Sequence, residues 1–187
     1  MPNEQAMKKQ QDESRFVSRT STEEAPDPKT ADFTTLVELL ERSVENYGDD
    51  PLFGTKVEGE YDWMSYQEFA DRVAGFRRAL DDLGIAKGDT VAIIADNRVE
   101  WAIAAYATYG RAGKFCPMYE DQQDKEWRYI LEDSGAKLAI VADMEVDETV
   151  HPWTDEIETL ENVIHLDGPS DHERSFHKLL SEGMEDP

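Results

Sequence analysis

The sequence predicts an α/β fold, with a largely parallel sheet, helices on both faces of that sheet and a small hairpin near its start. Two observations support this. Apolar runs of strand length alternate with segments whose apolar residues recur every three to four positions. Glycines mark the ends of many of these segments, at Gly84, Gly88, Gly110, Gly113 and Gly135. Such alternation is typical of βαβ units, which build a parallel sheet covered by helices.

The first helix and the hairpin are indicated by local signals. Thr35 with Glu38 three residues later forms a capping box, and Gly48 is a natural end for the helix that follows. The segments 52–57 and 61–65 are strand candidates on either side of a short polar turn. We therefore expect a helix and then a β-hairpin.

The second helix has the clearest pattern in the chain. Ser65 with Glu68 forms another capping box, and apolar residues then recur at helical spacing up to Gly84, which ends the helix. The apolar run TVAII at 90–94 follows a polar turn. We expect this run to be a buried strand.

Strands and helices continue to alternate beyond that strand. Asn97 is expected to cap a helix over residues 98–109. Pro117 limits the strand that contains it or places that strand at a sheet edge. The later elements expected are a strand from 114, a helix at 124–133, a strand at 137–142, a weaker helix over about 146–159, a strand at 162–166 and a helix at 175–183. We expect the strands at 90–94, 137–142 and 162–166 to be parallel, with helices 65–83 and 98–109 packed on them.

The chain divides into a polar tail and a folded part. Residues 1–32 are rich in Gln, Glu, Ser, Thr and Pro and poor in large apolar side chains, so they cannot offset the entropy lost on ordering. We predict that this tail is disordered, and a docking arm built on Phe16 and Val17 is the functional alternative. Residues 33–187 are predicted to form the folded domain.

The charge balance argues against some partners. The 187 residues contain 42 Asp plus Glu against 19 Lys plus Arg, a formal net charge of -23. Nucleic acid and anionic membrane surfaces should therefore be repelled. The carboxylates are dispersed along the chain, which favours a protein of a halophilic cytoplasm, where salt screens the self-repulsion. An acidic protein of an ordinary cytoplasm is the alternative.

Cysteine usage and hydropathy indicate a soluble, cytoplasmic protein. Cys116 is the single cysteine, which excludes an internal disulfide and a cysteine zinc cluster. The first residues lack the apolar stretch of a signal peptide. No apolar run approaches the ~20 residues of a membrane helix.

No nucleotide-binding loop is evident. A P-loop needs Gly-x-x-x-x-Gly-Lys followed by Ser or Thr, whereas Gly113-Lys114 lacks the first glycine and is followed by Phe115. The turn after the strand at 90–94 has no glycine, and Asp96 stands where a phosphate would sit in a dinucleotide site. The sequence therefore predicts no cofactor-binding residue.

Metal and nucleophile motifs are equally weak. The histidines do not have the spacing of a metal site and are expected to be ordinary surface or half-buried side chains: His151, His165, His172 and His177. Cys116 lies in an apolar strand, where a thiol is usually inert packing. Ser134 is expected to cap a helix end. The tryptophans are expected in the core or half-buried rather than in a ligand cage: Trp63, Trp101, Trp127 and Trp153. We assign no catalytic, cofactor-binding or metal residue.

Four short motifs occur in a characteristic order. They are WMSYQEF at 63–69, LGIAKGDTVA at 83–92, NRVEW at 97–101 and YILEDSGAK at 129–137. In this order they resemble the N-terminal part of the adenylate-forming, AMP-binding acyl-CoA synthetases. The segment MYEDQQDKEW at 118–127 resembles the long-chain fatty-acid–CoA ligase branch.

The resemblance implies a partial adenylating-enzyme domain. The family's phosphate loop, rich in Ser, Thr and Gly and ending in Pro-Lys-Gly, has no counterpart in this sequence. The Tyr-Gly-x-Thr-Glu motif, the ribose-binding Asp and the catalytic Lys of the C-terminal domain also have none. Residues 33–187 are therefore expected to be an N-terminal portion truncated before the phosphate loop. ATP, Mg²⁺ and CoA are implied only for a complete enzyme.

Two classes of function remain open. The resemblance implies an N-terminal fragment of a long-chain fatty-acid–CoA ligase, inactive alone, whose complete form makes an acyl-adenylate and then transfers the acyl group to CoA. The alternative is a stand-alone interaction or regulatory protein. A split ligase completed by a partner polypeptide is a further possibility.

Overall fold

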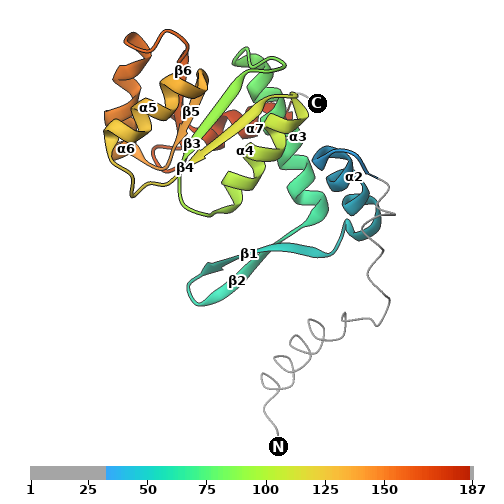
Figure 1. The fold of residues 1–187 in the computed structure, drawn as a ribbon. Helices are drawn as coiled ribbons and strands as arrows, with labels where there is room; N and C mark the ends of the chain where they lie inside the picture. Colours follow the sequence, from blue (N-terminus) through green and yellow to red (C-terminus); the bar gives the residue numbers. More distant parts are fainter. Residues whose placement is uncertain (1–32, 186–187) are drawn as a thin grey trace, which may run out of the picture. The chain divides into compact units, whose positions relative to one another are not determined.

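A parallel sheet of four strands forms the centre of the folded part. The computed structural model describes residues 33–185 (Figure 1). Its strands β3 (Thr90–Ile94), β4 (Lys114–Met118), β5 (Ala136–Val141) and β6 (Asn162–His165) lie in the order β4-β3-β5-β6, and neighbouring strands are parallel. This confirms the parallel arrangement predicted for β3, β5 and β6. The predicted tail at 1–32, with its docking arm at Phe16 and Val17, lies outside the described residues.

Helices cover both faces of this sheet. The helices α3 (Tyr66–Asp82), α4 (Val99–Gly110) and α7 (Phe176–Glu185) pack on one face, and α5 (Asp124–Ser134) and α6 (Met144–Val150) on the other. Successive strand side chains point to opposite faces. In β3, Val91 and Ile93 therefore join the α3 side, while Ala92 and Ile94 join the α5 side. Both faces need apolar side chains, which is why TVAII has no polar alternation.

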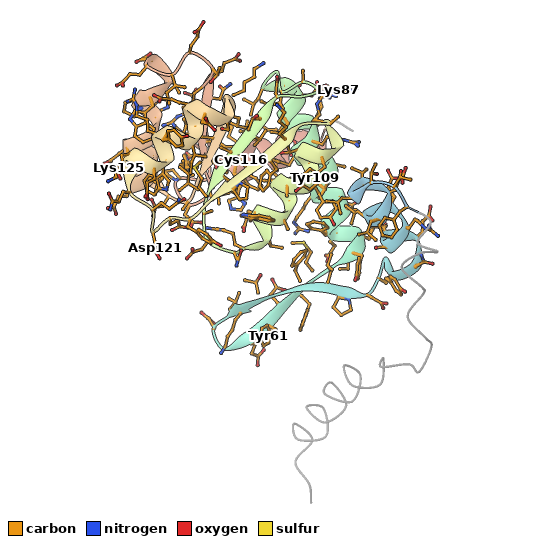
Figure 2. All side chains as sticks on the ribbon, viewed as in Figure 1. Tyr61, Lys87, Tyr109, Cys116, Asp121 and Lys125 are labelled. Atoms are coloured by element: carbon orange, nitrogen blue, oxygen red, sulfur yellow. The ribbon has the colours of Figure 1, made fainter. Side chains whose placement is uncertain are left out.

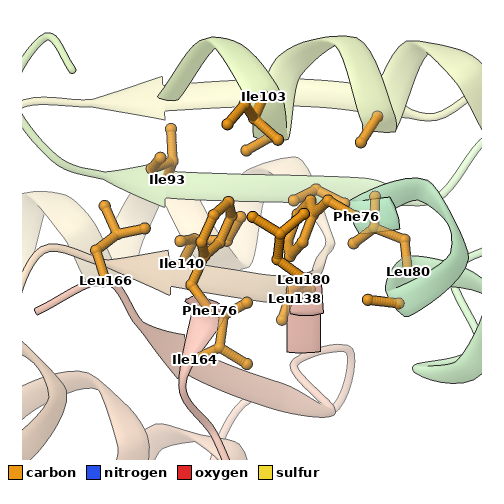
Figure 3. Packing of buried hydrophobic residues seen from close by; sticks show 14 of the residues in the cluster. Phe76, Leu80, Ile93, Ile103, Leu138, Ile140, Ile164, Leu166, Phe176 and Leu180 are labelled. Atoms are coloured by element: carbon orange, nitrogen blue, oxygen red, sulfur yellow. The ribbon is translucent and has the colours of Figure 1, made fainter. Parts of the chain in front are cut away.

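The core on the α3 side is built from aromatic and branched side chains of α3, β3, α4, β5, β6 and α7. Figure 3 shows Phe76 of α3, Phe176 of α7 and Ile140 of β5 within this cluster. The two rings have centroids 4.2 Å apart. The same two helices approach so closely that a Cβ atom on Gly183 would collide with the carbonyl oxygen of Gly75. Glycine at position 183 therefore permits the contact that seats α7 on α3.

A helix and a hairpin precede this layered unit. The helix α2 (Leu36–Tyr47) is followed by β1 (Pro51–Val57) and β2 (Glu60–Ser65), which pair antiparallel. No residue of either strand is buried. Leu52, Phe53 and Met64 attach the base of the hairpin to the core, and the rest projects from it (Figure 1). Figure 2 shows Tyr61 near its far end.

Most predicted element ends agree with the structure. Both capping boxes are present. The hydroxyls of Thr35 and Ser65 accept a hydrogen bond from the backbone N–H of Glu38 and Glu68 respectively, and each glutamate carboxylate accepts one from the backbone N–H of its cap residue. Gly135 ends α5 in the left-handed conformation. Pro117 lies in β4, which is an edge strand as expected.

Three predictions were wrong in detail. Asn97 does not cap α4; Arg98 is the residue before the helix, in extended conformation, and its side chain makes no cap hydrogen bond. Trp63 is exposed rather than half-buried, because the hairpin has no layer packed over it. The weaker helix ends earlier than residue 159, as α6 and then the 3-10 helix η2 (His151–Asp155), which contains Pro152.

Between residues 33 and 185, no helix is both long enough and apolar enough to cross a bilayer.

Candidate functional site

A ligand site in a sheet of this kind is expected at its carboxyl edge. In the order β4-β3-β5-β6, the chain leaves β3 for a neighbour on one side and then returns to place β5 on its other side. Sheets of this kind bind ligands in the crevice at such a reversal, beyond the carboxyl ends of the strands. Here Arg98 follows β3, Asp143 follows β5 and Asp167 follows β6.

Arg98 connects three elements at this edge. Its Nη1 and Nη2 atoms donate to the two carboxylate oxygens of Asp167 at 2.7 and 2.9 Å. Its Nε atom donates to Glu100 of α4 at 2.9 Å. The other oxygen of Glu100 lies 3.7 Å from Nε2 of His177 in α7. The guanidinium is therefore held between two carboxylates of this same chain.

The pKa values of these groups follow from that arrangement. Hydrogen bonds from Arg98 lower the pKa of Asp167 from its ordinary value of 3.8, against a smaller opposing effect of burial. Burial opposes ionisation of Glu100, but hydrogen bonding and attraction to Arg98 together lower its pKa below 4.5. The pKa of Arg98 itself is raised, mainly by Asp167. All three groups stay charged at neutral pH.

Other acidic groups at the edge are also engaged by the protein. Glu120, after β4, accepts a hydrogen bond from the backbone N–H of Asp96 at 2.7 Å. Asp143 accepts from the N–H groups of Glu145 and Val146 at 2.9 and 3.0 Å, and so caps α6. A phosphate brought to these groups would meet carboxylates and a guanidinium that is already paired. The donor set does not fit a nucleotide phosphate.

A groove opens beside this edge, between β1 and the start of α4. It has a volume of about 650 Å³. Its walls mix apolar side chains with the Arg98 network: Phe53, Gly54, Thr55, Asn97, Arg98, Val99, Glu100, Trp101 and Ala102. Pockets of ~300–1,000 Å³ are typical of small-molecule sites. The groove could hold an apolar group. The acidic and basic side chains among the residues that line it, Glu100 and Arg98, are already paired with each other.

A second hollow lies over α3, α7 and the end of α4. Its volume is about 760 Å³, and it is lined in part by Arg77, Arg111 and Asp81. Arg111 pairs with Asp81 at 2.5 Å and also donates to the carbonyl of Ile85 at 3.0 Å. The lining of this hollow is part polar and part apolar, and Arg111 and Asp81 in it are already paired with each other.

The residues weighed from the sequence do not converge on one site. Gly113 lies where a Cβ atom would be 3.1 Å from the carbonyl oxygen of Asp89, so it permits a tight turn into β4 rather than a phosphate contact. Cys116 is partly buried in β4 (Figure 2). The hydroxyl of Ser134 donates only a long bond, 3.4 Å, to the carbonyl of Leu131. Among the described residues, no group of three or more His, Cys, Asp or Glu side chains could hold a metal ion.

The structure also brings together residues whose pairing has no sequence signal. Arg98 and Asp167 are 69 positions apart, and although Arg98 lies in the NRVEW motif, Asp167 lies in none of the four motifs. His165 was expected at the surface or half-buried but is fully buried at the end of β6. Its position depends on the packing of later segments, which local patterns do not reveal.

Known proteins share part of this sequence and this fold. The family model described as "AMP-binding enzyme" matches residues 40–184. A relative from Arabidopsis thaliana, long chain acyl-CoA synthetase 8, is 26% identical over 152 residues, which cover 71% of this chain and 21% of the relative. The chain spans about a fifth of the length of the curated relatives it matches, between 18% and 21% for three of them.

Solved structures share the fold. A long-chain-fatty-acid-CoA ligase from Archaeoglobus fulgidus superposes with a TM-score of 0.64 at 21% identity, over 81% of this chain and 30% of that protein. The anthranilate CoA ligase AuaEII gives a TM-score of 0.69 at 19% identity, over 80% of this chain and 27% of that one. The described sheet and its helices thus occur within much larger ligases.

Proposed function

This chain belongs to the AMP-binding enzyme family, and on that basis we propose that it forms the N-terminal scaffold of a long-chain fatty-acid–CoA ligase. The match over residues 40–184 is the observation that carries the proposal. Relatives named as long-chain acyl-CoA synthetases support the fatty-acid branch. The likeness to solved acyl-CoA ligases supports the fold in which such chemistry occurs.

The reaction we propose for the complete ligase has two steps. The carboxylate of a fatty acid attacks the α-phosphorus of ATP, which forms an acyl-adenylate and releases pyrophosphate. The thiol of CoA then attacks the acyl carbonyl, and AMP leaves. Mg²⁺ would neutralise phosphate charge in the first step, as it does in phosphoryl transfer generally.

We assign none of these steps to a residue of this chain. Stabilising a transferring phosphate requires placed cations or backbone N–H groups that are free to meet it. At the carboxyl edge Arg98 is paired with Asp167 and Glu100, while Glu120 and Asp143 add negative charge. The role proposed for residues 33–185 is to support the parts of a ligase that hold ATP, Mg²⁺ and CoA.

ATP–pyrophosphate exchange tests this proposal. The 187-residue chain is assayed with palmitate and Mg²⁺ in molar KCl, alone and mixed with a polypeptide that supplies the phosphate loop and C-terminal domain of a long-chain ligase. We expect no exchange from the chain alone and measurable exchange from the mixture. Exchange by the chain alone would overturn the scaffold role. Exchange that appears only after mixing would support a split ligase.

A stand-alone interaction protein is the second candidate, and the hairpin favours it. Val57, Tyr61 and Trp63 are 53%, 60% and 45% exposed, which is high for large apolar side chains so near one another. Hydrophobic surface of this kind often marks a protein contact. If mixing with ligase segments restores no exchange but a different protein from the same cell binds the hairpin, the interaction role is the correct one.

The cellular setting is also part of the proposal. The net charge of -23 suits a high-salt cytoplasm, where counter-ions screen repulsion between carboxylates. A lack of any salt dependence in the stability of the chain would argue against this setting.

A further inference from the structure

A fully buried imidazole at the end of β6 is not used by the proposed function. His165 has no exposed surface, and neither of its ring nitrogens has a hydrogen-bond partner among residues 33–185. Buried polar groups are nearly always paired, because leaving one unpaired costs ~1–3 kcal/mol. A proton on this imidazole would add a buried charge without a partner, which costs still more. The ring is therefore neutral in this position.

The segment 166–175 encloses this side chain. A Cβ atom on Gly168 would lie 2.6 Å from Nδ1 and 2.8 Å from Cε1 of His165, so the backbone there lies directly on the ring. The His172 ring is next to it, with centroids 5.2 Å apart. The backbone N–H of His165 donates to the carbonyl of Arg174 at 3.0 Å. Movement of this segment would therefore uncover the ring.

Four charged or titratable groups face the ring. They are Asp147 of α6, His172 and Arg174 of the segment, and His177 of α7. Asp147 could offset a positive charge, but it is itself buried and already held by Arg174 through two bonds of 2.5 and 2.9 Å. Burial has the largest effect and lowers the pKa of His165 below its ordinary 6.5. Asp147 opposes it, and His172, Arg174 and His177 add to the lowering.

We propose that neutral His165 keeps the segment 166–175 closed, and that its protonation opens the segment and separates Asp167 from Arg98. Asp167 belongs to this same segment, two positions after the buried ring, and holds Arg98 by two hydrogen bonds of 2.7 and 2.9 Å. Movement of the segment would therefore break the hydrogen bonds between Asp167 and Arg98 at the carboxyl edge of the sheet. The inference stands on the packing around His165 and does not depend on the proposed function.

The direction of the pH effect follows from linkage. In the open segment the ring has its ordinary pKa near 6.5, and in the closed segment its pKa is lower. The open form therefore binds a proton that the closed form excludes, so closure is fully stable above about pH 6.5 and weakens as the pH falls below it. One proton bound on opening makes the opening constant rise up to ~10-fold for each pH unit.

Amide hydrogen exchange measured by mass spectrometry tests this on the full 187-residue chain in molar KCl. After correction for intrinsic rates, we expect opening of 166–175 to increase severalfold between pH 7 and pH 5.5, while β3 and β5 stay protected. His165→Phe keeps an aromatic ring and cannot be protonated, so its exchange should not depend on pH in this range. His172→Gln is the matched control and should retain the dependence.

Two results would overturn the proposal. The first is pH-independent exchange of 166–175 in the unmodified chain. The second is His165→Phe with the same pH dependence as the unmodified chain. If that variant does not fold, NMR of the unmodified chain decides. A His165 ring that titrates near pH 6.5 while the segment stays protected contradicts the proposal, and a ring that titrates together with opening supports it.

Discussion

The four-stranded sheet and the β1–β2 hairpin contain similar residue types in very different surroundings. In β3 every side chain is buried, and in β5 only Lys137 is partly exposed. In the hairpin no side chain is buried, although it contains Val57, Tyr61 and Trp63. β-forming residues therefore specify an extended backbone, whereas their burial depends on what packs against each face.

The two regions also differ in how their backbones are supported. β3 pairs with a strand on each side, and its two faces are covered by α4 and α5. The hairpin has one internal pairing and attaches to the core through its base. Isolated two-stranded hairpins are marginal in water. We therefore expect the sheet to set the global stability and the hairpin to open locally.

Truncating one aliphatic side chain in each region should give the largest difference in the free energy of unfolding. Ile140→Ala removes a fully buried side chain from β5 and should lower the free energy of unfolding by ~2–5 kcal/mol. Val57→Ala, at a position that is 53% exposed, should change it by ~0.5 kcal/mol or less. Urea denaturation in molar KCl measures both. Equal losses would show that the hairpin is packed into the cooperative core.

Ser65 joins the two regions, and its replacement should have an intermediate effect. It is the last residue of β2 and the cap of α3, where its hydroxyl accepts a bond of 3.1 Å from the N–H of Glu68. Ser65→Ala should cost ~1 kcal/mol. For a chain of this size that lowers the melting temperature by ~2–4 °C.

The matched control for this substitution is Ser134→Ala. The hydroxyl of Ser134 makes only a 3.4 Å contact at the end of α5, so its loss should leave the melting temperature nearly unchanged. A larger effect at Ser134 than at Ser65 would mean that the capping box does not stabilise α3.

Raising the salt concentration should give the smallest difference in local stability between the hairpin and the sheet. Residues 58–62 include Glu58, Glu60 and Asp62, whereas β3 carries no charged side chain. Raising KCl screens repulsion between these carboxylates and across the chain's net charge of -23. We expect the melting temperature to rise with KCl and the hairpin amides to gain more protection than those of β3. A melting temperature that does not rise would exclude the halophilic interpretation.

Local order in the chain was largely predictable from the sequence. Capping boxes at Thr35 and Ser65, the glycine end of α5 and the apolar runs of β3 and β5 each depend on residues within a few positions. Hydrogen bonds and backbone preferences over so short a distance are fixed by neighbouring side chains. The alternation of these elements was enough to predict a parallel sheet covered on both faces.

The tertiary structure decided everything that joins distant segments. The pairing of Arg98 with Asp167 could not be predicted from local patterns, because the two residues are 69 positions apart, and Arg98 rather than Asn97 is the residue before α4. The exposure of Trp63 and the burial of His165 were likewise decided by whether another layer covers them. Periodicity gives the face on which a side chain lies, but the burial of that face depends on packing between elements, and packing is a property of the whole folded chain.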